Sequence, residues 1–211
     1  LAEGEVHDLE AMLGAIRDDT RLVLLCNPNN PTGTYIPFPE IAAFVARVPE
    51  HVTVLIDEAY IEFQLHDRPD SSLALLSEYE NVVILRSFSK SHSLAGLRVG
   101  YAIGSPAFCA AVGAVRQPFS VNALAQAAAV EALKHSETIQ VQIRTAISER
   151  NRVEEGFAAI GLESADTQAN FSWVSLGENG AEIEHHVIAD LAEADGIDLR
   201  QLDPSELRRN I

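Results

Sequence analysis

The sequence predicts an α/β fold in which helices cover both faces of a mainly parallel sheet. Three short, continuous apolar runs, each bounded by turn-forming residues, have the composition of strands that are buried on both faces. Segments with helical spacing of apolar residues alternate with these runs, as expected of parallel strands joined by crossover helices. Strand, helix and strand follow a long helix near the end of the chain, which indicates the start of a smaller α+β domain.

The first half of the chain supplies the predicted sheet. Apolar residues recur at helical spacing over 6–17, and Asp8 is the expected N-cap of that helix. The other predicted elements are RLVLLC (21–26, strand), 37–49 (helix), VTVLIDEAY (52–60, strand), NVVILR (81–86, strand) and LRVGYAIG (97–104, strand). The last two strands are too close together for a crossover helix, so we expect them to pair in antiparallel orientation.

The second half is predicted to be mainly helical. Residues 106–117 and 121–135 are rich in alanine, and we expect both segments to form buried helices. An apolar stripe over 136–160 predicts a single long helix, which Gly161 ends. The later predicted elements are a strand over 167–176, a helix over 182–196 and a strand over 197–200. The predicted domains are a large one over 1–150 and a small one over 151–211.

The composition limits the partners of the chain. A formal net charge of −16 over 211 residues argues against a nucleic-acid partner, because binding to phosphates needs a basic surface. No apolar run reaches the length of a membrane span, and no signal-peptide pattern opens the sequence, so we expect no membrane partner. Cys26 and Cys109 lie far apart and outside any metal-ligand spacing, which indicates reduced thiols in a cytoplasmic protein and no metal site.

Polar residues follow each of the first three predicted strands, in the segments NPNNPTG, DEAY and SFSK. Ligands of an open parallel sheet bind at the carboxyl ends of the strands, so we expect Asn30, Asp57, Tyr60 and Lys90 to lie at one crevice. A strand-end carboxylate and amine, each taken alone, equally fit an exposed ion pair of little energetic value. The occurrence of all these groups together favours a binding site.

Anion-binding groups flank Lys90. Arg98 offers a planar fork suited to a phosphate, and Ser87 and Ser89 supply hydroxyl donors for the same anion. A second cation near a lysine favours the free-amine form, which attacks carbonyl carbons. Asp57 is suited to pair with a protonated ring nitrogen. Pyridoxal 5′-phosphate carries the carbonyl, the phosphate and the ring nitrogen that these groups would bind, so the sequence predicts this cofactor.

The motifs CNPNNPTG, DEAY and SFSKSHSLAGLRVGY, in this order and spacing, resemble the class I/II (fold-type I) aminotransferases. Within that family they are most similar to the histidinol-phosphate and aromatic amino acid aminotransferase branch. PFSVNALAQAAA and TQANF extend the resemblance along essentially the whole chain. The resemblance implies the fold-type I large domain followed by the start of the small domain, and we expect the chain to be a fragment of the full fold.

The resemblance assigns roles to the residues at the strand ends. Lys90 is similar to the Schiff-base lysine that also shuttles a proton, and Asp57 to the partner of the cofactor's ring nitrogen. Asn30 and Tyr60 resemble the pair that hydrogen-bonds the cofactor's phenolic oxygen. In similar enzymes the peptide bond that corresponds to Asn30–Pro31 is cis.

The remaining roles concern the phosphate and the substrate. Ser87 and Arg98 resemble the phosphate ligands, with Ser89 as an addition, and Asn170 matches a position near the substrate. The chain departs from the family pattern at His92, where an aromatic residue is usual. This departure concerns the loop after Lys90 and not the lysine itself.

The resemblance implies transamination of histidinol phosphate or an aromatic amino acid with 2-oxoglutarate, by a homodimer that binds small-molecule substrates. Two alternatives stay open at this point. A lyase or decarboxylase on the same scaffold, such as a threonine-phosphate decarboxylase, shares the cofactor residues. A truncated remnant would fold without turnover. The sequence does not identify the amino donor.

Overall fold

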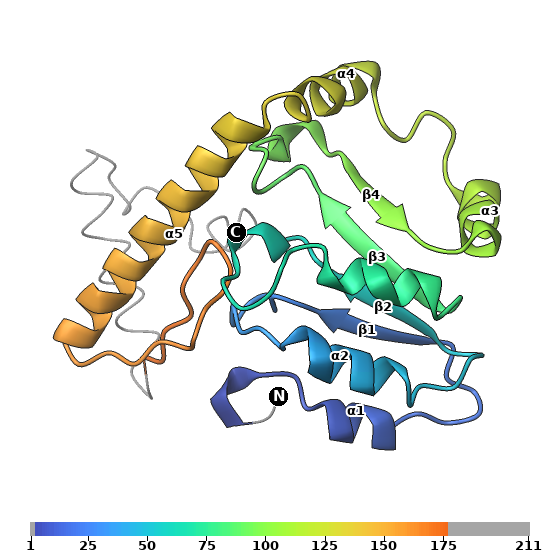
Figure 1. Cartoon of the computed structure of the whole chain (residues 1–211), viewed down its shortest axis with the longest axis horizontal. Helices are drawn as coiled ribbons and strands as arrows, with labels where there is room; N and C mark the ends of the chain where they lie inside the picture. Colours follow the sequence, from blue (N-terminus) through green and yellow to red (C-terminus); the bar gives the residue numbers. More distant parts are fainter. Residues whose placement is uncertain (1–2, 177–211) are drawn as a thin grey trace, which may run out of the picture. The chain divides into compact units, whose positions relative to one another are not determined.

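A four-stranded mixed sheet forms the centre of the computed structural model, which describes residues 3–176 (Figure 1). The strands, in their order across the sheet, are β1 (Leu22–Cys26), β2 (Thr53–Asp57), β3 (Val82–Ser87) and β4 (Gly100–Ile103). β2 pairs in parallel orientation with both β1 and β3, whereas β4 pairs antiparallel with β3. The predicted α/β fold and the antiparallel fourth strand are confirmed.

Five α-helices and four short 3-10 helices surround the sheet in the described residues. The α-helices are α1 (Leu9–Gly14), α2 (Phe38–Val45), α3 (Pro106–Val115), α4 (Ala123–Ala132) and α5 (Ser136–Ala159). The 3-10 helices are η1 (Glu3–Glu5), η2 (Ile61–Phe63), η3 (Ser71–Ser77) and η4 (Ala95–Leu97). Asp8 caps α1 as predicted, because its carboxylate accepts a hydrogen bond from the Ala11 N–H at 2.9 Å. None of the helices in this part of the chain has the length and apolarity needed to cross a membrane.

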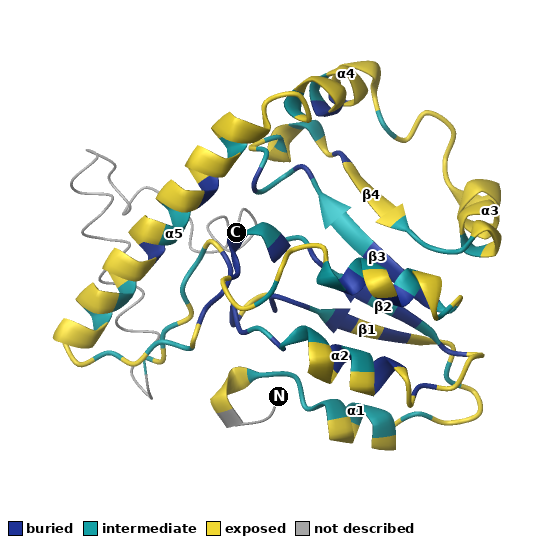
Figure 2. Cartoon of the chain, viewed as in Figure 1, coloured by how far each residue is buried: buried dark blue, intermediate teal, exposed yellow. Residues whose placement is uncertain are grey.

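The main core lies between one face of the sheet and helices α1, α2 and η3. Leu25, Ile56 and Ile84, one from each parallel strand, have no exposed surface, and Phe44 of α2 packs against this layer. The opposite face of β1 is not covered by described residues, since Leu22 and Leu24 are 54% and 57% exposed (Figure 2). The prediction that this strand is buried on both faces is therefore wrong for the described part of the chain.

The alanine-rich helices are much less buried than predicted. α3 has no buried residue, and Figure 2 shows most of it exposed. α4 buries only Ala125 and Ala129, which pack against Phe88 and Val99. Small side chains distributed around a helix allow burial but do not require it, so composition alone misled the prediction for α3.

α5 is the predicted single long helix, and it ends at Ala159, two residues before Gly161. Gly161 has a φ of 79°, and the N–H of Leu162 donates to the Phe157 carbonyl at 3.0 Å, as in a Schellman motif. The helix passes residue 150 without a break, and the domain boundary expected there stays a prediction. The helix over 182–196 and the strand over 197–200 lie outside the described residues.

A buried ion pair joins β3 to the end of β2. Arg86 Nε donates to the Glu58 carboxylate at 2.9 Å, and the two side chains are 10% and 2% exposed. Arg86 Nη1 also donates to Asp70 at 2.7 Å, whose side chain is 74% exposed. Removing one partner of a buried pair leaves the other charge without compensation, whereas an exposed partner is replaced by water.

We expect Glu58→Ala to lower the free energy of unfolding by about 2 kcal/mol, because it leaves Arg86 Nε without its carboxylate while Nη1 keeps its bond to Asp70. Asp70→Ala, the matched control, is expected to cost less than about 1 kcal/mol. Urea unfolding monitored by circular dichroism measures both values. Equal losses for the two variants would contradict the importance of the buried pair.

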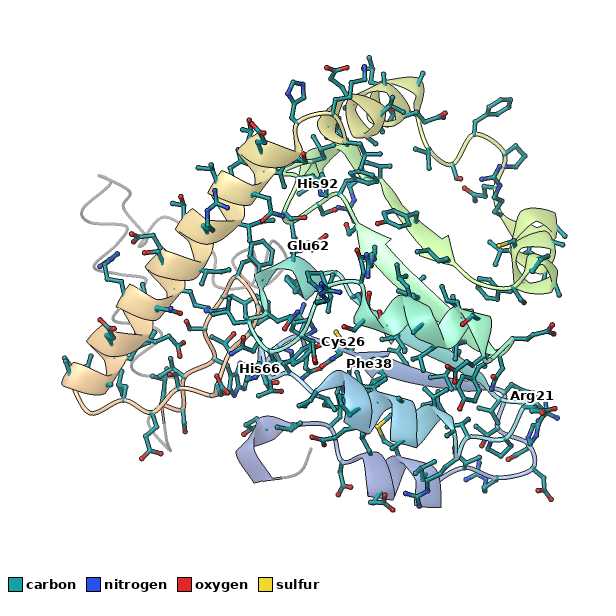
Figure 3. The ribbon with its side chains drawn as sticks, viewed as in Figure 1. Arg21, Cys26, Phe38, Glu62, His66 and His92 are labelled. Carbon is teal, nitrogen blue, oxygen red and sulfur yellow. The ribbon has the colours of Figure 1, made fainter. Side chains whose placement is uncertain are left out.

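Glu62 is a second carboxylate close to the end of β3, and Figure 3 labels it in η2. Its Oε2 is buried and accepts no hydrogen bond from any residue that the structure describes. Burial raises the pKa of the Glu62 carboxyl, although the Ser91 hydroxyl and the Arg86 charge act in the opposite direction. The ionised form of Glu62 is therefore less favourable in the folded chain than in the unfolded chain.

Glu62→Gln is expected to stabilise the fold more at about pH 7 than at about pH 4, relative to the unsubstituted chain. A carboxyl whose pKa is raised by folding stabilises at low pH, and this stabilisation is lost as the pH rises through its folded-state pKa. The amide does not titrate and avoids that loss. Urea unfolding at both pH values tests this, with the exposed Glu80→Gln as the control. A pH-independent difference would show that Glu62 is not destabilised by ionisation.

Candidate active site

The parallel strands end side by side at one edge of the sheet. Cys26 of β1 is in register with Asp57 of β2, and Asp57 is in register with Leu85 of β3. Asp57 Oδ1 accepts a hydrogen bond from the Ala59 N–H at 3.0 Å, which fixes the orientation of the carboxylate. The segments that follow β1, β2 and β3 therefore start from the same edge, as the sequence predicted.

Tyr60, in the segment after β2, contacts residues of the segments that follow β1 and β3. It is 5% exposed, and its hydroxyl oxygen accepts a hydrogen bond from Asn30 Nδ2 at 3.3 Å. Lys90 Nζ lies 4.9 Å from the centroid of the Tyr60 ring. Because the hydroxyl accepts from Asn30, its own proton is available to donate to a ligand. The structure thus brings Asn30, Tyr60 and Lys90 together, while their roles stay predictions.

Ser87, Ser89 and Arg98 lie around the connection between β3 and β4. Ser87 Oγ accepts a hydrogen bond from the Ser89 N–H at 2.9 Å, and Ser87 pairs with Gly100 across the sheet. Arg98 is exposed, has a left-handed backbone with φ of 54°, and donates from Nη1 to the Ala95 carbonyl at 2.9 Å. A left-handed arginine is uncommon and marks a constrained position. The proximity of Ser87 and Arg98 follows from strand pairing and not from a direct contact.

The Asn27 side chain stabilises the turn after β1 by hydrogen bonds to the backbone of Ile36. Asn27 is 2% exposed, donates from Nδ2 to the Ile36 carbonyl at 2.9 Å and accepts from the Ile36 N–H at 2.7 Å. The Asn30–Pro31 peptide bond is cis, as the resemblance implied, and so is the Asn27–Pro28 bond. These hydrogen bonds of Asn27 were not predicted from the sequence, because the partner residue, Ile36, lies nine residues later, beyond the turn.

Asn170 belongs to a loop and not to the predicted strand over 167–176. The Thr167 hydroxyl donates to the Phe171 carbonyl at 2.7 Å, and such a local side-chain bond competes with strand pairing. Asn170 itself is exposed and borders a hollow of about 500 Å³ beside α5. Its link to the other candidates runs through Phe171, whose ring packs edge to face on Tyr60 at 5.1 Å.

Gly33 lets this loop approach the turn after β1. Gly33 has a φ of 75°, and a Cβ at this position would lie 1.9 Å from Thr167 Oγ1. The Gln168 N–H donates to the Gly33 carbonyl at 2.7 Å. Gln168 also accepts a hydrogen bond from the Leu65 N–H at 3.0 Å. Sequence reasoning did not identify Thr167 or Gln168, and the only signal for them was their place beside Asn170 in TQANF.

The groups at this edge of the sheet are chemically complementary to one type of ligand. Lys90 supplies an amine for a carbonyl carbon, and Asp57 supplies a carboxylate for a cationic ring nitrogen. Tyr60 and Asn30 supply donors for an anionic oxygen. The hydroxyls of Ser87 and Ser89 and the guanidinium of Arg98 are suited to a phosphate. A phosphorylated pyridine aldehyde with a phenolic oxygen matches this set of donors and acceptors.

Comparisons with known proteins agree with this chemistry. The family model "Aminotransferase class I and II" matches residues 2–208. The aromatic amino acid aminotransferase of Mycobacteroides abscessus is 48% identical over 176 residues, which are 83% of this chain and 50% of that protein. The histidinol-phosphate aminotransferase 2 of Ralstonia nicotianae is 45% identical over 173 residues, or 82% of this chain and 46% of that protein.

A solved structure shows the same fold. The histidinol-phosphate aminotransferase from Sinorhizobium meliloti, in complex with pyridoxal-5′-phosphate, superimposes with a TM-score of 0.81 at 31% identity. The match covers 93% of this chain and 53% of that one. The chain thus spans about half the length of the curated relatives that it matches. On the extent of the family match and the identity to these relatives, the chain belongs to the class I and II aminotransferase family.

Proposed function

We propose that this chain carries the pyridoxal 5′-phosphate site of an aminotransferase that moves the amino group of histidinol phosphate or an aromatic amino acid to 2-oxoglutarate. One observation carries this proposal. A buried tyrosine, Tyr60, is contacted on its hydroxyl by Asn30 and on its ring by Lys90, the residue at the family's reactive-lysine position. Three separate strand ends contribute these residues, which is difficult to explain by packing alone.

Each group that holds the cofactor has a defined task in this proposal. The Asp57 carboxylate, oriented by the Ala59 N–H, keeps the ring nitrogen protonated. The Asn30 and Tyr60 side chains donate to the phenolic oxygen. The phosphate is held by Ser87, Ser89 and Arg98. When bound, pyridoxal phosphate accepts the electron pair that the substrate carbon keeps as its proton leaves.

Lys90 is the proposed acid and base. Its free amine takes the proton from the substrate's α-carbon, and its ammonium form returns a proton to the reacting atoms. The face of the Tyr60 ring lies 4.9 Å from Lys90 Nζ and attracts the ammonium form electrostatically. Tyr60 therefore helps Lys90 to hold the proton between its removal and its return.

Asn170 is proposed to contact the substrate. Its loop approaches Gly33 through Thr167 and packs on Tyr60 through Phe171, and this contact with a proposed cofactor ligand supports the proposal. Aromatic amino acids and histidinol phosphate are proposed as donors because the two relatives described above are named an aromatic amino acid aminotransferase and a histidinol-phosphate aminotransferase. Both are named aminotransferases, so a decarboxylase is less well supported.

We also propose that the protein is a cytoplasmic homodimer. Large apolar side chains are exposed on α3, on α4 and between them, and their exposed fractions are 82% for Val115, 99% for Phe119 and 77% for Leu124. Clusters of exposed apolar residues are typical of protein interfaces. Cys26 and Cys109 are both free, which supports a reducing compartment.

The lysine content allows a direct test of the cofactor site, since Lys90 and Lys134 are the only lysines. The chain is incubated with pyridoxal phosphate, reduced with borohydride and digested, and mass spectrometry locates the added mass. We expect the label on Lys90 and not on Lys134, which is exposed and paired with Glu131 at 2.8 Å. Lys134→Ala should be labelled like the unsubstituted chain, whereas Lys90→Ala should not. Equal labelling of both lysines, or none, would refute the proposed site.

Turnover of the bound cofactor separates the alternatives. Addition of an aromatic amino acid to the loaded chain is expected to produce pyridoxamine phosphate without release of carbon dioxide, and Asp57→Asn should slow this step at least about hundredfold. Asp18→Asn, at an exposed position, is the control. Carbon dioxide release without the pyridoxamine form would indicate a decarboxylase. A loaded chain with neither reaction would indicate the inactive remnant.

A further inference from the structure

Arg150 of α5 is a buried cation that hydrogen-bonds to two separate loops. It is 7% exposed, and its Nη1 donates to the carbonyl oxygens of Phe63 at 3.1 Å and Ala169 at 3.0 Å. No carboxylate of residues 3–176 lies within salt-bridge distance of its guanidinium. Burial lowers the pKa of Arg150, although the charges of Glu154 and Asp166 act in the opposite direction. The two carbonyls, together with the Asn151 Oδ1 atom that accepts a hydrogen bond from Arg150 Nε at 3.4 Å, are therefore the direct compensation for burying this charge.

Both carbonyls belong to loops that carry residues of the proposed site. Phe63 is the last residue of η2, which follows Tyr60 directly. Ala169 directly precedes Asn170. The rings of Tyr60 and Phe171 also connect the two loops, with centroids 5.1 Å apart. One nitrogen of Arg150 thus ties together segments that are about a hundred residues apart in the sequence.

The rest of α5 supports this contact. Ile143 lies two turns before Arg150 on the same face of the helix and is 4% exposed. It belongs to an apolar cluster with Tyr60, Phe63 and Ala169, the same two loops that Arg150 contacts. The helix is therefore anchored to these loops by packing at one point and by hydrogen bonds at another.

We infer that Arg150 is a positioning residue that holds the Tyr60 and Asn170 loops in one arrangement, and thereby sets the hydrogen bonding at the cofactor's phenolic oxygen and at the substrate. This inference rests on the proposed function, because it uses the roles assigned there to Tyr60 and Asn170. Arg150 acts through these residues and contacts neither cofactor nor substrate itself.

The expected effect follows from the chemistry of the phenolic oxygen. The Tyr60 hydroxyl must stay within reach of Asn30 Nδ2, now at 3.3 Å, for both to donate to the same oxygen. Donors stabilise the anionic form of that oxygen. If the loops are released from Arg150, this donation weakens, and the pH midpoint of the cofactor's visible absorption moves upward.

The first test compares Arg150→Gln and Arg150→Lys with Arg152→Gln on the same helix. Arg152 is exposed and pairs with Glu149 at 2.8 Å, so it controls for the loss of one positive charge. With pyridoxal phosphate bound to the full chain, Arg150→Gln is expected to raise the absorption midpoint by about half a pH unit or more. It should also weaken cofactor binding about tenfold in equilibrium dialysis. Arg150→Lys keeps a positive charge that can donate to one of the two carbonyls, so its absorption midpoint and cofactor affinity should lie between those of Arg150→Gln and the unsubstituted chain.

A second test needs no cofactor and therefore measures the contact role of Arg150 even if the proposed function fails. Hydrogen exchange of the free chain is expected to be about tenfold faster in Arg150→Gln at both loops together, residues 60–65 and 167–171, and unchanged in α2. Arg152→Gln should match the unsubstituted chain.

The outcomes separate the two claims. If the unsubstituted chain binds no pyridoxal phosphate, the proposed function fails, and joint loosening of both loops still supports the contact role of Arg150. If Arg150→Gln loses thermal stability but keeps the absorption midpoint and the dialysis constant, Arg150 only stabilises the fold and the inference is overturned. Faster exchange at α5 alone would overturn it as well.

Discussion

The register of the parallel strands is the constraint on which the whole site depends. Cys26, Asp57 and Leu85 lie across from one another, so the polar segments after β1, β2 and β3 all begin at one edge. Side chains alternate between the two faces of a strand, and a slip of one residue would turn the Asp57 carboxylate to the other face. The antiparallel return of the chain through β4 then adds Arg98 close to Ser87. The sheet thus decides which groups can share a ligand.

The sheet alone does not complete the proposed site, because the Asn170 loop follows α5 in the chain and not a strand of the sheet. Contacts over long sequence separations hold this loop: the close approach of Thr167 to Gly33 and the hydrogen bonds of Arg150. Arg150 is buried and Arg86 is half-buried, and both connect segments close to Tyr60. These two arginines thus hydrogen-bond to segments that follow the strands, and they hold those segments next to the proposed site.

Local patterns were sufficient for the strands and for the convergence at Tyr60. Continuous apolar runs identified β1, β2 and β3, and the position of Lys90 after β3 was enough to predict its approach to Tyr60. The exposure of Leu22 and of α3 could not be predicted, since burial depends on which other segment lies opposite. The role of Arg150 was not predicted, because a single charged residue within an apolar stripe does not indicate burial. Its partners are backbone carbonyls, which the pattern of side chains in the sequence does not reveal.

The most direct measurement of the central claim is a crystal structure of this chain grown with pyridoxal phosphate. We expect one cofactor molecule at the carboxyl edge of the sheet, with density joined to the Lys90 side chain. Its ring nitrogen should lie within hydrogen-bond distance of the Asp57 carboxylate, and its phosphate within that distance of Arg98. A cofactor bound elsewhere, or side chains of Lys90, Asp57 and Arg98 that face different regions, would refute the proposed pyridoxal phosphate site.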